Sequence, residues 1–252
     1  MDTIYESINA AYDSFMSKLL IDRKTGILGL ITNPAYSVLK GSIRFSGYPF
    51  LGSRYTDSSP KILVVGLDIG LDELKDENTY HSLKSRNGKI EPQKQSDNHY
   101  NKHISGTYGI GMYLLKNSYG WEDVWNTYFS GKNTTFENLI NKYGPSVLPY
   151  DVLSHIALTN IHKFVTVNRI SRSGNENRVW YNPDLEKDFF IKEVDILSPD
   201  IILIQGQSSF DRGLLEILKN KGVKLVLADH PSSWRNGAHK PTYVSKLKYI
   251  NW

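Results

Sequence analysis

The sequence of 252 residues contains no cysteine. This absence excludes disulfide bonds, thiolate zinc sites, cysteine nucleophiles and iron–sulfur clusters held by cysteine. No apolar run approaches the ~20 residues that a membrane-spanning helix needs. The first residues, MDTIYESINAAYDSF, carry acidic side chains and lack the apolar segment of a signal peptide. We therefore expect a cytoplasmic protein that makes no contact with a membrane.

Motifs of several enzyme classes are missing as well. No GxGxxG fingerprint and no Walker-type GK[ST] follows a predicted strand, and no HExxH or similar metal-ligand spacing occurs. His155 and His162 lie seven residues apart, but a predicted strand boundary separates them. We expect no metal site and no cofactor.

What the sequence does contain is the composition of an ordinary globular chain, with 40% hydrophobic and 22% charged residues. Its formal net charge of +4 is compatible with a polyanionic partner but does not require one. A chain of this length suits a single α/β domain. We expect one domain and a monomer, with a helical N-terminal extension over residues 1–58 before a core over residues 59–252.

Short β-branched runs alternate with helical patterns along the chain. Apolar side chains at helical spacing predict a helix over residues 2–20. Further helices are predicted at residues 106–120, 121–129, 134–144, 183–199, 208–222 and 241–250. Buried strands are predicted within residues 61–70, 155–164, 200–206 and 223–231. The alternation indicates an α/β protein, a three-layer α/β/α sandwich around a central four-stranded parallel sheet.

Polar side chains follow three of the predicted strands, namely Asp68, Asn160 and His230. In open α/β sheets, ligands bind outside the carboxyl ends of the strands, so an acid, an amide and an imidazole are expected in one crevice, with Asp68 facing His230. Each residue also has a simpler explanation. Asp68 can form a turn or cap a helix, Asn160 can hold a turn, and His230 can bond to the main chain.

Four segments resemble, in order, motifs of the uracil-DNA glycosylase superfamily. GLDIG at 66–70 resembles the water-activating motif, which reads GQDPY in the best-known branch, and LTNIHKF at 158–164 resembles the TNxVK segment of other branches. SPDIILIQG at 198–206 resembles the strand before the late helix, and HPSSWRN at 230–236 is similar to the HPSP motif. The resemblance implies that superfamily's fold and a monofunctional DNA glycosylase.

The same resemblance implies a role for each polar residue. Asp68 would orient or deprotonate the water that attacks the sugar C1′, Asn160 would bond to the base edge, and His230 would donate to the base carbonyl. These residue types suit the chemistry, because an oxocarbenium-like sugar needs a carboxylate nearby and a departing base anion needs a donor. A side-chain amide offers both a donor and an acceptor for reading a pyrimidine.

A base in a duplex must be flipped out of the stack before it can enter such a crevice. Tyr108 would stack under the flipped base, and Trp234 or Arg235 would fill the gap in the duplex. Phosphate contacts are expected from basic and hydroxyl side chains, namely Lys163, Arg169, Arg172, Ser232, Ser233 and Lys240. For each of these residues, an ordinary place in the core or on the surface is the competing interpretation.

The segment after Asp68 departs from the family pattern. The family motif continues with Pro and Tyr, and that tyrosine is understood to exclude the thymine methyl group, whereas Ile69 and Gly70 follow here. The pocket could then accept a pyrimidine with a substituent at C5, such as the modified cytosines of phage DNA that anti-phage members of the superfamily remove. The polar loops at 72–102 and 168–182 could contact an enlarged base or the DNA strand.

Two alternatives to a glycosylase stay open from the sequence. The departure at Ile69 and Gly70 is also compatible with a DNA-binding module that has lost catalysis. A nucleoside hydrolase or another small-molecule hydrolase could use the same crevice. Release of a base from DNA would distinguish a glycosylase from both of these alternatives.

Overall fold

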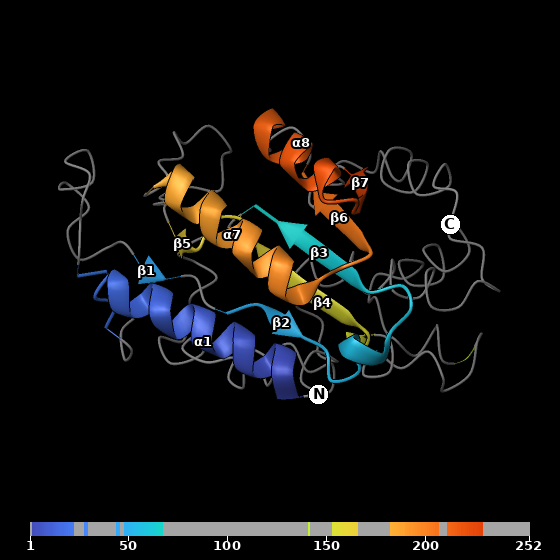
Figure 1. Ribbon diagram of the computed structural model, residues 1–252, viewed down its shortest axis with the longest axis horizontal. Helices are drawn as coiled ribbons and strands as arrows, with labels where there is room; N and C mark the ends of the chain where they lie inside the picture. Colours follow the sequence, from blue (N-terminus) through green and yellow to red (C-terminus); the bar gives the residue numbers. More distant parts are fainter. Residues whose placement is uncertain are drawn as a thin grey trace. The chain divides into compact units, whose positions relative to one another are not determined.

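The computed structural model describes residues 2–22, 28–29, 44–45, 48–67, 141, 153–165, 182–206 and 211–228 (Figure 1). The chain divides into two compact units. Unit 1 comprises Met1–Phe50, Leu67–Gly88 and Thr159–Ser198, and unit 2 comprises Leu51–Gly66, Lys89–Leu158 and Pro199–Trp252. In the part of the chain that is described, no helix is long and apolar enough to cross a membrane.

The protein is an α/β protein, and its described residues form a five-stranded, mostly parallel mixed sheet. Its strands, in spatial order, are β2 (Phe50–Leu51), β4 (Ile156–Asn160), β3 (Ile62–Gly66), β6 (Ile201–Gln205) and β7 (Lys224–Ala228). The four predicted strands are confirmed, but the sheet is not four-stranded, because β2 adds a fifth. With only two residues in an aromatic and glycine-rich stretch, β2 is too short to show a sequence period.

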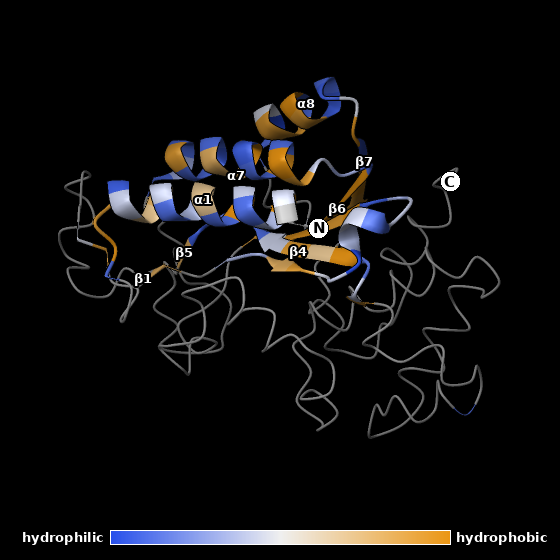
Figure 2. Cartoon of the chain, turned by 60° about the horizontal axis from the view of Figure 1, so that its bottom comes forward, coloured by the Kyte–Doolittle hydropathy of each residue, from blue (hydrophilic) through white to orange (hydrophobic). Residues whose placement is uncertain are grey.

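The parallel part of the sheet lies in unit 2. Val64 of β3 is paired with Leu203 of β6, which is paired with Val226 of β7. Every residue of β3 and β6 is buried. Uninterrupted burial is what β-branched runs without polar alternation predict for strands of a parallel sheet, and Figure 2 shows β6 in the orange of apolar residues.

A helix joins the last two strands of unit 2. Helix α8 (Arg212–Asn220) begins after Asp211, whose carboxylate accepts the main-chain N–H of Gly213 at 3.0 Å. Leu214 and Leu218 are buried on one side of α8, which packs against β7. The unit β6–α8–β7 is therefore the parallel crossover that the sequence predicts.

Two helices, side by side in Figure 1, make up much of unit 1. Helix α1 (Asp2–Lys18) confirms the predicted N-terminal helix. Helix α7 (Pro183–Leu197) begins at a proline, and the side chain of the preceding Asn182 accepts the N–H of Leu185 at 3.1 Å. Rings from both helices and from the segments 45–48 and 164 pack together, namely Tyr12, Phe15, Phe45, Tyr48, Phe164 and Phe189.

A small second sheet and a helix end also belong to the described part of unit 1. Strands β1 (Arg44–Phe45) and β5 (Phe164–Val165) pair antiparallel and were not predicted, since each has two residues. At the end of α1, the N–H of Ile21 bonds to the Met16 oxygen at 3.0 Å and that of Leu20 to the Ser17 oxygen at 3.2 Å. Leu20 is therefore in the left-handed position of a Schellman motif, with φ 52°.

The other predicted elements fall outside the described residues. They are the loops at 72–102 and 168–182, of which only Asn182 is described, and the helices at 106–120, 121–129, 134–144 and 241–250, of which only the helical residue Asn141 is described.

Candidate functional site

The parallel strands of unit 2 end at one edge of the sheet. The last paired residues are Val65 with Ile204, between β3 and β6, and Gln205 with Ala228, between β6 and β7. Leu67 follows β3 directly, and Gly206 follows β6 with φ 94°, a conformation that favours glycine. This edge is where the rule for open α/β sheets places a ligand.

Within unit 1, the segments that follow β3 and β4 are joined by a hydrogen bond. The main-chain N–H of His162 donates to the oxygen of Leu67 at 2.9 Å. Leu67 and His162 are both buried. Leu67 immediately precedes Asp68, and His162 comes two residues after Asn160. The structure therefore brings Asn160 close to the residue that precedes the predicted catalytic acid.

Asn160 is the last residue of β4 and is half-buried, in a strand whose four preceding residues are buried. Its main-chain oxygen accepts a hydrogen bond from the Lys163 ammonium at 2.6 Å. The residue whose side-chain amide is predicted to read the base is therefore bound, through its main-chain oxygen, by the ammonium of Lys163.

Lys163 occupies a place that its predicted role did not anticipate. Its side chain is 1% exposed, and Nζ lies 2.6 Å from Oε2 of Glu193 in a buried ion pair. Nζ also donates to Oγ1 of Thr159 at 2.8 Å. With Asn160 these contacts use the three ammonium hydrogens. This burial is at odds with a contact between Lys163 and a DNA phosphate, so we do not retain that contact.

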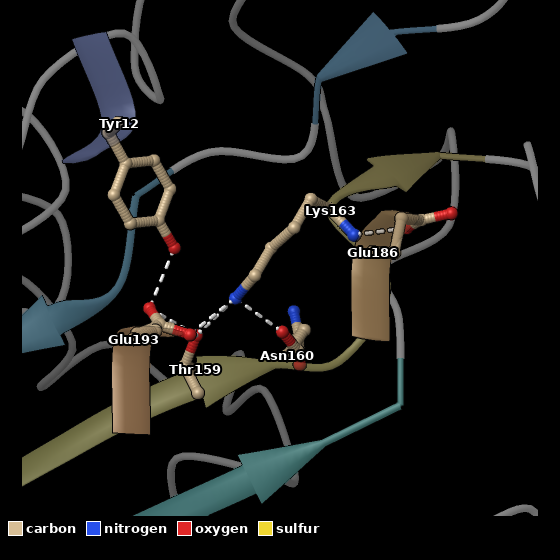
Figure 3. A network of polar contacts seen from close by, with 6 residues as sticks. All are labelled: Tyr12, Thr159, Asn160, Lys163, Glu186 and Glu193. Carbon is tan, nitrogen blue, oxygen red and sulfur yellow. Dashed lines mark hydrogen bonds and ion pairs between the residues drawn. The ribbon is translucent and has the colours of Figure 1, made fainter. Parts of the chain in front are cut away.

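Glu193 is the centre of this buried network (Figure 3). Besides Lys163, its carboxylate accepts the hydroxyl of Tyr12 at 2.7 Å and the hydroxyl of Thr159 at 3.0 Å. Burial and the neighbouring Glu193 carboxylate raise the pKa of Tyr12 well above its ordinary value of 10.0. Tyr12 therefore acts as a donor to Glu193 across the physiological range.

A second carboxylate of α7 binds the main-chain N–H of Lys163. Glu186, whose side chain is 0% exposed, accepts the main-chain N–H of Lys163. It also accepts the main-chain N–H of Asn182 at 3.4 Å and lies 3.5 Å from Nδ1 of His162. Glu186 belongs to the first turns of α7, where the helix dipole favours a negative charge.

The prediction from sequence missed Tyr12, Thr159, Glu186 and Glu193. One feature of the sequence does indicate that the two glutamates are buried. They are seven residues apart, so they share one face of α7, and that face also carries the buried Phe190 and Leu197. An acid in the apolar stripe of a helix needs a buried partner.

The remaining predicted site residues lie outside the described residues. They are Asp68, Ile69, Gly70, Tyr108, Arg169, Arg172, His230, Ser232, Ser233, Trp234, Arg235 and Lys240. Among the residues that are described, no group of three histidine or acidic side chains is arranged to hold a metal ion.

Comparison of the sequence with protein-family models and with curated proteins gives no significant match. The resemblance to the uracil-DNA glycosylase superfamily therefore rests on the four motifs and their order alone.

Proposed function

We propose that the protein is a monofunctional DNA glycosylase that hydrolyses the N-glycosidic bond of a flipped-out pyrimidine and leaves an abasic site. One observation carries the proposal beyond the motifs. The 2.9 Å bond from His162 N–H to the Leu67 oxygen joins the end of the GLDIG strand to the TN segment. This bond supports the proposal, because the proposed chemistry requires Asp68, which follows Leu67, to act near Asn160. The proposal includes a three-layer arrangement of the superfamily's kind and a cytoplasmic location.

The proposed roles follow from the chemistry of an expelled base. The Asp68 carboxylate stabilises positive charge on the sugar and activates the water. The Asn160 amide reads the base edge. His230, two residues beyond the end of β7, donates to the base carbonyl as the negative charge grows.

The proposed substrate is uracil or a pyrimidine with a substituent at C5. Gly70 has no side chain at the position where the family motif has tyrosine, which supports a larger pocket. Tyr108 is proposed to stack on the base, and Trp234 or Arg235 to enter the gap in the duplex. DNA phosphates would be bound by Arg169, Arg172, Ser232, Ser233 and Lys240 rather than by Lys163.

The test is mass spectrometry of bases released from a panel of DNAs that contain uracil, 5-modified pyrimidines or heavily modified phage genomes. The wild-type protein is expected to release one class of base and to leave alkali-sensitive sites. Asp68→Asn should lower the rate of release by about 10²–10⁴-fold, the usual contribution of a general base. Asp188→Asn, at an exposed position on α7, is the matched control and should release base at the wild-type rate.

Three outcomes would contradict the proposal. Equal rates for Asp68→Asn and wild type would remove the assigned mechanism. Salt-dependent binding to DNA without any released base would favour a binding module. Hydrolysis of free nucleosides without action on DNA would favour a small-molecule hydrolase.

A further inference from the structure

We infer that Lys163 is a positioning residue for Asn160, and that α7 holds Lys163 in that role through Glu186 and Glu193. The inference rests on the proposed function, in which the Asn160 side chain reads the base. It adds a support for the base-reading residue that the motifs do not assign.

The ammonium of Lys163 bonds to the main chain at the end of β4. Asn160 is the last residue of the strand, so its carbonyl oxygen stands where the strand's regular bonding stops. The ammonium of Lys163, three residues later, donates to this oxygen at 2.6 Å. It also donates to the hydroxyl of the preceding residue, Thr159, at 2.8 Å. The side chain of Lys163 thus closes the turn from which the Asn160 side chain projects.

Two glutamates of α7 hold Lys163 itself. Glu193 binds the ammonium at 2.6 Å, and Glu186 accepts the main-chain N–H of the same residue. Next to it, the N–H of His162 is bound by the Leu67 oxygen at 2.9 Å. The short segment after β4 is therefore fixed at three main-chain groups and one cation. Such support keeps a functional side chain near its productive geometry.

The pair of Lys163 and Glu193 is buried although its charges are costly to remove from water. Replacing a buried ion pair by apolar residues of similar size is often neutral or stabilising, so stability alone is a weak reason for one. Packing between α1 and α7 is already provided by rings, such as Phe15 stacked on Phe189 with centroids 4.0 Å apart. An apolar pair could fill the same volume, but it could not donate to the Asn160 oxygen.

The experiment separates this role from folding with a neutral pair. Lys163→Met combined with Glu193→Gln removes the donor to Asn160 without leaving a buried unpaired charge. Lys219→Met is the control, because Lys219 forms a 2.7 Å pair with Glu216 that is 56% and 65% exposed. Base release is measured under single-turnover conditions on the DNA that the wild type acts on. Affinity is measured with a duplex that carries a tetrahydrofuran abasic site, which offers Asn160 no base.

The double variant is expected to fold, to bind the abasic duplex as the wild type does, and to release base up to about 100-fold more slowly, because a misplacement of about 1 Å at a site can cost this much. The Lys219→Met variant should match the wild type in both measurements. In NMR spectra, the Asn160 side-chain amide should give one sharp pair of signals in the wild type and shifted or broadened signals in the double variant.

A stable double variant with the wild-type rate and unchanged Asn160 signals would overturn the inference. If the wild type releases no base from any DNA, the proposed function fails. The NMR comparison then decides the inference alone, since unchanged Asn160 signals show that Lys163 does not position this residue.

Discussion

The Lys163 ammonium lies 2.6 Å from Oε2 of Glu193, and the two side chains are 1% and 0% exposed. The exposed pair Lys219–Glu216 has nearly the same length, 2.7 Å. The two ion pairs therefore differ in burial and hardly at all in length. Burial decides how much each pair contributes to stability, because water screens the exposed pair far more than the buried one.

Removing one partner of each pair should give very different losses of stability. Lys163→Met leaves Glu193 buried without its counter-charge and is expected to lower the free energy of unfolding by about 3–5 kcal/mol. Lys219→Met should lower it by at most about 1 kcal/mol. Urea denaturation followed by circular dichroism measures both. Similar losses in the two variants would show that the buried pair is solvated in solution.

Tyr12 should make the protein lose stability at alkaline pH. Burial, and then the Glu193 carboxylate, raise its pKa well above 10.0, the value expected in the unfolded chain. The unfolded state therefore releases this proton first. The contribution is complete below pH 10 and is lost as the pH rises towards the folded-state pKa.

The variant Tyr12→Phe is expected to be less stable at neutral pH by about 1.5–3 kcal/mol, since a hydrogen bond to a charged group is lost. Its stability should fall less steeply than that of the wild type above about pH 10. Urea midpoints at several alkaline pH values measure the slope. A Tyr12→Phe slope equal to that of the wild type would contradict the assignment.

A glycine at the end of α1 should stabilise the protein. Leu20 has φ 52° and is 66% exposed, so its side chain strains the main chain and buries little surface. Leu20→Gly is expected to add about 0.5–1 kcal/mol to the free energy of unfolding, since a residue with a Cβ is disfavoured by roughly 1–2 kcal/mol in this conformation. Leu20→Ala keeps the Cβ and should add nothing. Thermal unfolding distinguishes the two, and an equal gain from alanine would point to exposure rather than strain.

Gly52 stands where no side chain fits. A Cβ there would lie inside van der Waals contact with the main-chain oxygens of Leu153 and Ser154. These oxygens cannot move freely, because the N–H of Arg54 bonds to the Ser154 oxygen at 2.8 Å. Gly52→Ala should therefore lose about 1–3 kcal/mol of stability.

Gly213→Ala, in the first turn of α8, is the control for Gly52. There the nearest atom to a new Cβ is a carboxylate oxygen of the Asp211 side chain at 3.3 Å, and this side-chain end needs to shift by only a few tenths of an ångström. Alanine is also the better helix former by about 1 kcal/mol. Urea midpoints should move down for Gly52→Ala and stay level or rise for Gly213→Ala. Equal changes of the urea midpoint in both variants would mean that the main chain around Gly52 shifts to make room for the new side chain.

The longer elements could be predicted because each one repeats a pattern. Strand β6 is apolar at every position except Gln205, and α7 has both a starting proline and a helical period. Strands β1 and β5 have two residues each, and their pairing depends on which distant segment comes to lie alongside. No pattern in the neighbouring sequence indicates which segment pairs with each of these strands.

The candidate site could be predicted only as far as the strand ends. Asn160 ends β4 as the sequence indicated. Lys163, three residues later, was predicted to face DNA and is instead buried. A lysine in a polar segment looks exposed until the helix with its counter-charge is placed, and Glu193 comes 30 residues later in the chain. Its position in the apolar stripe of α7 was the one local sign.

The hydrogen bond between Tyr12 and Glu193 also has a consequence for the order of events on the ribosome. The two residues are 181 positions apart. At the usual rate of about 5–20 residues per second, Tyr12 is synthesised roughly 10–40 seconds before its partner. Throughout that interval the apolar face of α1 has no α7 to cover it. The nascent chain therefore presents this face to chaperones throughout that interval, and unit 1 can close only after α7 has been synthesised.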